Sequence, residues 1–246
     1  MSGSIKTRQN QSRKVLLHVL PHLGQVPLRD VTAARLRAYI ADLEKSCSPQ
    51  YARAILGALS NIFETAIDDK RLIRNPMRAK SVRWPKADEG RREAWPPETA
   101  RQMRDSISDR YRITVVLGVG CGLRQGEVFG LSPDDIDYEK GVIYVRRQVQ
   151  AFCGRLYFTL PKGGKTRVAD MPVSVARELR EHSEKYPAVE VELPRGEPGK
   201  PTRKVLLLTT RFGNAVAVNT YNTYIWKPAL ARVGIIPPWP AGAKPW

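Results

Sequence analysis

The chain has 246 residues, 42% of them hydrophobic, which suffices for one large core or two smaller ones, and the length favours two domains. No stretch approaches the roughly 18 consecutive apolar residues of a membrane-spanning helix, and residues 1–10 are polar where a secretory signal would be apolar. We therefore expect a cytoplasmic protein without a membrane partner. The 41 Lys and Arg exceed the 24 Asp and Glu, which gives a formal net charge of +17. An excess of this size predicts a polyanionic partner such as double-stranded DNA, bound with a strong dependence on salt.

The cysteines and histidines do not form a metal-binding pattern. The cysteines are Cys47, Cys121 and Cys153. They are odd in number and lack C-x-x-C spacing, so we interpret them as small buried apolar residues and not as disulfide partners or metal ligands. The histidines are His18, His22 and His182. None has acidic or cysteine neighbours at ligand spacing, and the sequence therefore predicts neither a metal nor another cofactor.

Residues 1–78 are predicted to form an all-helical domain. Thr32 precedes apolar residues at helical spacing, which indicates a helix start. Ser48 before Pro49 indicates a second start, because serine caps a helix and proline fits its first position. That helix is expected to end near Asp69. The weak candidates for DNA contact in the first 80 residues are Arg35, Arg37, Arg53 and Lys80.

Residues 79–95 are predicted to be an exposed linker between two basic domains. Their composition changes to Lys, Arg, Pro, Asp and Gly without apolar periodicity. Residues 1–92 carry 18 basic and 8 acidic side chains, and the remaining residues carry 23 and 16. Both domains are therefore expected to face the same DNA.

Residues 96–246 combine helical and strand patterns, so the fold class predicted for the whole chain is α+β and mostly helical. Helices are predicted from Pro96 or Pro97 through Met103, over the buried run 113–119, and over 173–186 and 219–233. Pro228 lies inside the last of these and predicts a kink or an early stop.

The strand patterns predict one small antiparallel sheet in this second domain. They cover residues 142–149, 156–160 and 168–171, with turns that contain glycine between them. Residues 205–208 read as a short buried strand. Residues 187–203 are rich in proline, glycine and charge, and are predicted to be irregular.

A glycine-rich turn at residues 120–128 contains the first candidate for chemistry, Arg124. The guanidinium of an arginine is a rigid fork of five donors that suits bidentate contact with a phosphate. Glu127, three residues further on, is expected to orient that fork. The alternative for an isolated Gly-Leu-Arg is that Arg124 pairs with a surface carboxylate.

This run resembles the first catalytic-arginine box of the tyrosine recombinases, the phage integrase family. The matching residues are Gly122, Leu123, Arg124, Gly126, Glu127, Leu131, Asp135 and Ile136. A second run at residues 160–172 is similar to the family's β-hairpin with a catalytic lysine. It points to Lys162, with Lys165 as the alternative; a solvated turn that binds phosphate nonspecifically is the competing interpretation. Residues 1–78 are similar to the family's core-binding domain, and residues 96–246 to its catalytic domain.

The resemblance implies cleavage of DNA by a tyrosine that forms a 3′-phosphotyrosyl link without metal or ATP. It implies that Arg124 stabilises charge in the transition state, that Lys162 protonates the leaving 5′-oxygen, and that Glu127 braces the arginine. The family's His-x-x-Arg box and late tyrosine have no counterpart in these residues. We interpret Tyr221 and Tyr224 as residues of an apolar helix face instead.

We therefore expect the chain to stop short of the family's C-terminal end, as a shortened product, a partial chain or an interrupted reading frame. Alone it is expected to be a monomer that binds DNA without cutting it, whereas the full-length protein would oligomerise on DNA. The alternative is a noncatalytic recombinase remnant that occupies sites or regulates excision. A third hypothesis is an unrelated basic protein that binds RNA or DNA.

Overall fold

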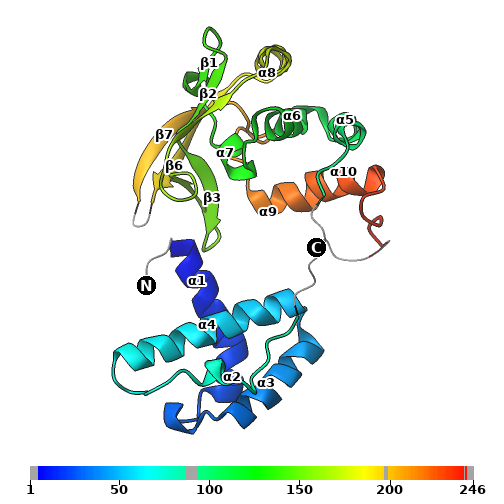
Figure 1. The fold of residues 1–246 in the computed structure, drawn as a ribbon. Coiled ribbons are helices and arrows are strands. Elements are labelled where there is room, and N and C mark those ends of the chain that lie inside the picture. The colour runs from blue at the N-terminus through cyan, green and yellow to red at the C-terminus, as the bar shows by residue number, and fades with distance from the viewer. Residues whose placement is uncertain (1–4, 87–92, 197–198, 241, 243–246) are drawn as a thin grey trace. The chain divides into compact units, whose positions relative to one another are not determined.

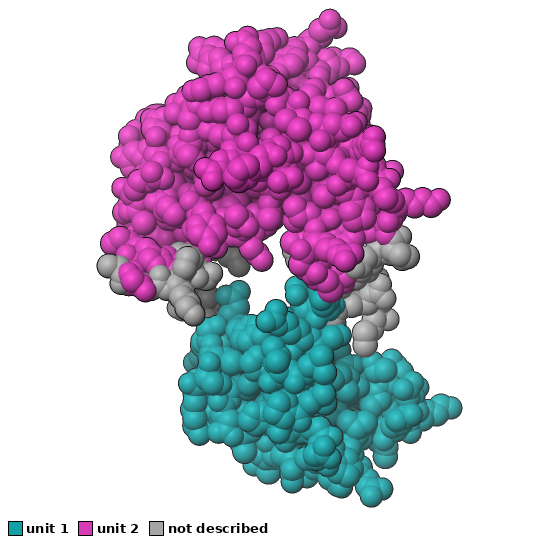
Figure 2. Space-filling model, turned by 180° about the vertical axis from the view of Figure 1, so that it is seen from behind, with its two compact units in different colours: residues 1–93 teal, residues 94–246 magenta. Residues whose placement is uncertain are grey.

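The structure is a computed structural model that describes residues 5–86, 93–196, 199–240 and 242 (Figure 1). The chain divides into two compact units, residues 1–93 and 94–246 (Figure 2), and each unit has its own hydrophobic core. Within the predicted linker, residues 87–92 lie outside the described part. No helix among the described residues is long and apolar enough to cross a membrane.

The first unit is helical. Its elements are α1 (Ile5–Lys14), a π-helical turn (Val15–Val19), α2 (Leu20–Leu23), α3 (Ala33–Ser46), α4 (Pro49–Asp68) and short 3-10 turns at Leu28–Asp30 and Pro76–Arg78. Both predicted helix starts are confirmed. Thr32 Oγ1 accepts a hydrogen bond from the backbone N–H of Arg35 at 3.3 Å, and Ser48 Oγ accepts one from that of Tyr51 at 3.4 Å. These bonds satisfy N–H groups that the first turn of a helix leaves without partners.

The second unit packs its helices against two small sheets. The helices are α5 (Pro97–Ser106), α6 (Arg112–Cys121), α7 (Gln125–Phe129), α8 (Val173–Lys185), α9 (Val218–Tyr221) and α10 (Lys227–Arg232), with 3-10 turns at Asp109–Tyr111 and Pro133–Asp135. A π-helical segment, Asn222–Trp226, joins α9 to α10. Pro228 lies in the first turn of α10, directly after the π-helical segment, and the predicted early stop does not occur. The α+β, mostly helical fold class is confirmed.

The strands of the second unit form two sheets, so the prediction of one sheet is wrong. The strands are β1 (Ile136–Asp137), β2 (Val142–Val145), β3 (Gln148–Phe152), β4 (Arg155–Thr159), β5 (Arg167–Asp170), β6 (Val189–Arg195) and β7 (Lys200–Leu206). One sheet has the order β1-β2-β5 and the other the order β3-β4-β6-β7. The predicted strand 142–149 is divided at Arg146 and Arg147, because β2 pairs with β5 whereas β3 pairs with β4. The β4–β6 pairing is parallel, so the second sheet is mixed.

The segment predicted to be irregular, residues 187–203, contains most of a long antiparallel hairpin instead. Strands β6 and β7 pair from Val189 opposite Leu206 to Arg195 opposite Lys200. Val191 is buried in the core, whereas Glu192 and Arg203 pair on the exposed face. The alternation that marks a strand is present, but the many charged residues on its outer face conceal it in the composition.

Candidate functional site

Arg124 is presented to solvent by a turn between α6 and α7. Helix α6 ends at Gly122, whose φ of +62° is left-handed and favours glycine. Leu123 then turns inward, with 6% of its surface exposed, and its N–H donates to the Leu117 carbonyl at 3.2 Å. Arg124 follows at the start of α7 with 58% of its side chain exposed. The turn therefore buries one residue and projects the next.

Glu127 holds both the backbone and the side chain of Arg124. Its carboxylate, fully buried, accepts the Arg124 N–H at Oε2 and the Arg124 Nη1 at Oε1, both at 2.9 Å. Burial by itself would raise the pKa of Glu127, but the hydrogen bonds from Arg124 and Arg167 outweigh it and leave that pKa below its ordinary value. The carboxylate that Arg124 pairs with is thus an ionised group in the interior and not one on the surface. A brace of this kind restricts the orientation of the guanidinium.

Arg167, from β5, is the residue of this site that the sequence reasoning missed. Its Nη2 donates to Glu127 Oε2 at 2.8 Å and to the Gly122 carbonyl at 3.0 Å, and 34% of its side chain is exposed. Two guanidiniums thus share one carboxylate, which leaves the cluster with net positive charge. Arg167 belongs to the same run, residues 160–172, that contains Lys162, but no spacing rule relates it to Glu127, 40 residues away.

Helix α7 is fixed in place by contacts on two sides. A methyl group added to Gly126 would lie 3.0 Å from the carbonyl oxygen of Val149 in β3, a contact so tight that the backbone would have to shift by a few tenths of an ångström. On another side, Gln125 Nε2 donates to Asn222 Oδ1 at 2.7 Å, which ties α7 to the π-helical segment. Figure 1 shows α7 between β3 and the α9–α10 region. Close packing against β3 thus explains Gly126 of the motif. The contacts on both sides fix helix α7, which begins directly after Arg124.

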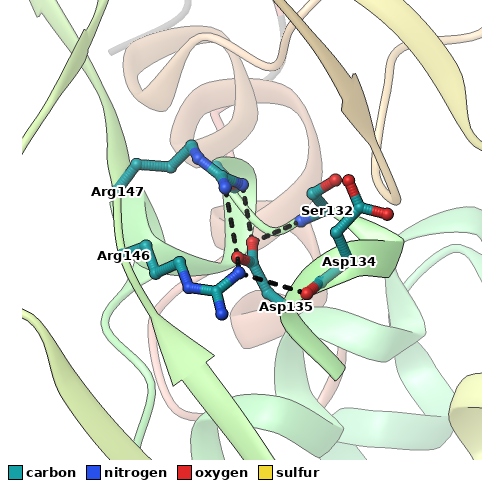
Figure 3. Close-up of polar contacts among 6 residues, drawn as sticks. Ser132, Asp134, Asp135, Arg146 and Arg147 are labelled. Atoms are coloured by element: carbon teal, nitrogen blue, oxygen red, sulfur yellow. Dashed lines mark hydrogen bonds and ion pairs between the residues drawn. The ribbon is translucent and has the colours of Figure 1, made fainter. Parts of the chain in front are cut away.

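A buried ion pair anchors the junction between β2 and β3 (Figure 3). Arg147 donates to both carboxylate oxygens of Asp135, at 2.6 and 3.1 Å, and the Ser132 N–H donates to the same group at 2.9 Å. Asp135 is 1% and Arg147 14% exposed in their side chains. Arg146 adds a bond to the Asp134 carbonyl at 3.2 Å. Asp135, a motif match in the sequence, therefore holds together the place where the chain leaves one sheet for the other.

The predicted lysine hairpin is not present, because β4 and β5 belong to different sheets. Residues 160–166 cross from one sheet to the other, with Gly163 and Gly164 at φ of +87° and +72°. Lys162 and Lys165 are both exposed on this loop. Neither forms a hydrogen bond or ion pair with any residue that the structure describes. The assignment of Lys162 as the acid, and of Lys165 as its alternative, stays a prediction.

The four weak DNA-contact candidates of the first unit are all exposed. Arg37 Nη1 donates to Ser81 Oγ at 3.0 Å, and Arg53 Nη1 donates to the Pro85 carbonyl at 3.0 Å while its guanidinium lies over the Trp84 ring. Both therefore brace the segment that follows the helices. DNA contact by these two residues, and by Arg35 and Lys80, stays a prediction.

The structure corrects two interpretations of single residues. Cys153 is exposed at φ +46° in the β3–β4 turn, and Cys47 and Cys121 are partly exposed, so the cysteines are not all buried; none of the three forms a disulfide. Tyr221 is buried with its hydroxyl 2.6 Å from Thr114 Oγ1, as an apolar-face position requires, but Tyr224 is 60% exposed.

His182 and the other possible metal ligands do not gather into a site. The His182 ring is buried, with Nε2 3.2 Å from the Leu207 carbonyl oxygen. Burial lowers the pKa of His182 and so favours the neutral ring. Within the described ranges, no three or more His, Cys, Asp or Glu side chains form a group that could hold a metal ion.

Comparison with known proteins shows what this chain resembles. Residues 2–81 match the family described as "Phage integrase central domain". The chain is 29% identical over 220 residues to a "Tyrosine recombinase XerC-like" protein of Caldanaerobacter subterraneus subsp. tengcongensis, covering 81% of this chain and 54% of that protein. It is 26% identical over 231 residues to the integrase of Mycobacterium phage D29, covering 93% of this chain and 58% of that protein.

Solved structures share the fold. The integrase of the Tn1549 transposon, in complex with transposon right end DNA, matches with a TM-score of 0.74 at 20% identity, over 89% of this chain and 70% of that one. A lambda integrase tetramer bound to a Holliday junction matches with a TM-score of 0.70 at 17% identity, over 95% of this chain and 62% of that one. The chain is thus similar in sequence to tyrosine recombinases and phage integrases. It spans little more than half the length of the curated relatives named above.

Proposed function

We propose that this chain binds duplex DNA, and that the protein to which it belongs performs site-specific recombination through a 3′-phosphotyrosyl intermediate. The observation that carries the proposal is the Arg124 guanidinium, exposed on a rigid turn and held by a fully buried, ionised Glu127. A donor group oriented in advance toward a phosphate stabilises the charge that develops when phosphorus is attacked. The names of the recombinase and integrase relatives, and the net charge of +17, support the same reaction class.

In this proposal each residue of the site has a distinct task. A tyrosine attacks the phosphorus, the bond to the 5′-oxygen breaks, and Arg124 stabilises the charge on the non-bridging oxygens. Lys162 donates a proton to the departing 5′-oxygen, with Lys165 as the alternative donor. Glu127 is a positioning residue, because it acts through Arg124. Arg167 joins it in that role, since it contacts the same carboxylate.

The two units are proposed to divide the work of holding DNA. Residues 1–78 would be the core-binding domain, residues 79–95 the linker and residues 96–246 the catalytic domain. The match of residues 2–81 to an integrase central domain supports the first assignment. Arg35, Arg37, Arg53 and Lys80 are proposed as DNA contacts of the first part.

The state of assembly is proposed to depend on DNA. We infer that this chain alone is a monomer that binds without cutting, and that the whole protein oligomerises on DNA. The tetramer seen for lambda integrase on a Holliday junction supports the second statement. A noncatalytic DNA-binding recombinase remnant or regulator is the second candidate. Sequencing the reading frame downstream of Trp246 separates the two candidates: an in-frame box and tyrosine support the recombinase, and a stop codon supports the regulator.

Titration of a labelled duplex at several salt concentrations tests the DNA-binding proposal. The logarithm of the association constant is expected to fall linearly with the logarithm of salt concentration, with a slope of about −0.9 for each phosphate contacted. Arg124→Ala is expected to weaken binding more than Arg101→Ala, which removes an arginine from the exposed pair with Glu98 at the same three-residue spacing. Absence of duplex binding, or binding that does not change with salt, would overturn the proposal.

A further inference from the structure

A second basic site is formed by a pocket of about 200 Å³ in the second unit. Its cationic lining residues are Arg146, Arg147, Arg195 and Lys204, and Thr159 and Thr202 contribute hydroxyl groups. No acidic residue of the described part lines it. The pocket shares no lining residue with the Arg124–Glu127–Arg167 cluster, so it is a separate site.

The positive charge of this pocket is only partly compensated. Arg147 is paired with Asp135 through two bonds, and Arg146 lies 3.4 Å from the same carboxylate. The side chains of Arg195 and Lys204, in contrast, form no ion pair or hydrogen bond with any residue in the described ranges. At least two cations thus face the pocket without an anionic partner among the residues that the structure describes.

The β6–β7 hairpin separates its charges by face. Arg203, the neighbour of Lys204 in β7, points to the opposite face and pairs with Glu192 at 2.6 Å. Lys204 lies on the same side of the strand as Thr202 and lines the pocket. On the outer face of the hairpin Arg203 is thus paired with Glu192, whereas Arg195 and Lys204 on the inner face have no ion pair among the described residues.

A buried hydroxyl at the pocket also has no partner. Thr159 Oγ1 is shielded from solvent and forms no hydrogen bond with the described residues. A buried polar group without a partner costs free energy, which a ligand with acceptor oxygens would recover. Guanidinium, ammonium and hydroxyl donors around one space are the set that binds a phosphate group.

We propose that this pocket binds a backbone phosphate of duplex DNA, an inference that rests on the DNA binding proposed above. The side chains of Arg146, Arg195 and Lys204 are exposed, so the pocket opens on a surface that a polymer can approach. Leu160 also lines it, and Lys162 follows two residues later. A phosphate held here restrains the loop that carries the predicted general acid, so the pocket is a second anchor for DNA beside that loop.

Neutralising the unpaired cations tests the site. The double variant Arg195→Gln with Lys204→Gln is compared with Arg155→Gln with Arg203→Gln, which removes the same charge from exposed residues that do not line the pocket. At about 100 mM salt the pocket variant is expected to bind a duplex about tenfold more weakly than the parent, with a salt slope smaller by about 0.9, and the control is expected to change less than about twofold. Equal losses in both double variants would overturn the inference.

Replacing single phosphates with neutral methylphosphonates identifies the contact. One position is expected at which the replacement weakens binding by the parent but not by the pocket variant. A titration with inorganic phosphate at constant ionic strength distinguishes the other source of the same chemistry. Pocket-dependent binding of inorganic phosphate, with duplex affinity unchanged in the pocket variant, would show a free-phosphate site and would contradict a DNA contact.

The variant Thr159→Val distinguishes a role in DNA binding from a role in stability alone. The substitution keeps the shape and removes the unpartnered hydroxyl, so the thermal midpoint is expected to stay level or rise while duplex affinity falls. Lowered stability with unchanged affinity would contradict the site. If the parent fails to bind any duplex, the proposed function itself fails; if the parent binds and the pocket variants match it, only this inference fails.

Discussion

Arg167 Nη2 donates a hydrogen bond to Glu127 Oε2 at 2.8 Å and so joins β5 to α7 across 40 residues of sequence. The same carboxylate holds Arg124, so a single buried anion orients two arginines. The cluster retains a positive charge on its exposed side, where a phosphate can approach. The stability of the turn and its proposed chemistry therefore depend on one side chain.

Replacing Glu127 with Gln is expected to destabilise the second unit by roughly 1.5–3 kcal/mol, because two partly exposed arginines lose the charged hydrogen-bond acceptor between them. Urea unfolding measures the loss. Glu98→Gln is the control, since Glu98 forms an exposed pair with Arg101 and is expected to cost less than about 1 kcal/mol. Similar losses of unfolding free energy in the two variants would show that Glu127 does not stabilise the cluster.

Asp135 is predicted to contribute more to the unfolding free energy than Asp134, its neighbour in sequence. Asp135→Asn is expected to cost roughly 3–5 kcal/mol of unfolding free energy, because Arg147 stays buried without its carboxylate. Asp134→Asn changes an exposed side chain and is expected to stay within about 0.5 kcal/mol of the parent. Thermal and urea unfolding compare the two, and a large loss for Asp134→Asn would contradict this account of Figure 3.

Acid stability is predicted to depend on Asp109. Hydrogen bonds from Lys185 and Tyr186, aided by the charges of Lys185 and Arg112, lower the pKa of Asp109 to about 2. A carboxyl group whose pKa is lowered on folding stabilises the protein at every pH above its ordinary pKa of 3.8. This contribution is lost as the pH falls through the folded-state pKa of about 2. The difference in unfolding free energy between the parent and Asp109→Asn is expected to shrink from pH 5 to pH 2. A difference that does not change over this range would contradict the assignment.

Arg124 is predicted to act on cleavage more than on affinity. In a longer protein that contains the nucleophile, Arg124→Ala is expected to slow suicide-substrate cleavage by about 10²–10³-fold while duplex affinity changes by less than about tenfold. Arg124→Lys keeps the charge but loses the bidentate fork, so it is expected to restore affinity and not cleavage. Cleavage that survives in Arg124→Ala would favour an unrelated basic nucleic-acid-binding protein.

A change of leaving group is predicted to show whether Lys162 or Lys165 is the general acid. A substrate with sulfur in place of the 5′-bridging oxygen leaves without protonation, because a thiolate is far more stable than an alkoxide. Lys162→Ala is expected to cleave this substrate at nearly the parental rate and the ordinary substrate slowly. Lys165→Ala is expected to cleave both normally, and the reverse pattern would assign the acid to Lys165.

Several parts of the structure were predictable because their causes lie within a few residues. Thr32 and Ser48 begin their helices through bonds to the third residue beyond, and Glu127 contacts Arg124 three residues before it. Such contacts follow from helical geometry alone. The candidate role of Arg124 was accessible for the same reason, because its turn and its brace belong to one short motif.

The strand pairings were not accessible in this way. The run 142–149 has the same apolar pattern whether it forms one strand or two, and only the pairing of β2 with β5 and β3 with β4 divides it. In the β6–β7 hairpin, charged residues on the exposed face obscure the alternation that would have indicated strands. Pairing partners are distant in sequence, so local pattern does not determine them.

The sequence by itself determined the helices, the two-part organisation expected of the chain, the excess of positive charge and the turn that presents Arg124. Each of these depends on composition or on neighbours within one helical turn. Only the tertiary structure decided that Arg167 shares the carboxylate of Glu127, and that Arg195 and Lys204 meet Thr159 around one pocket. Those residues come together because strands from different parts of the chain pair in a particular register, and register is a property of the folded core.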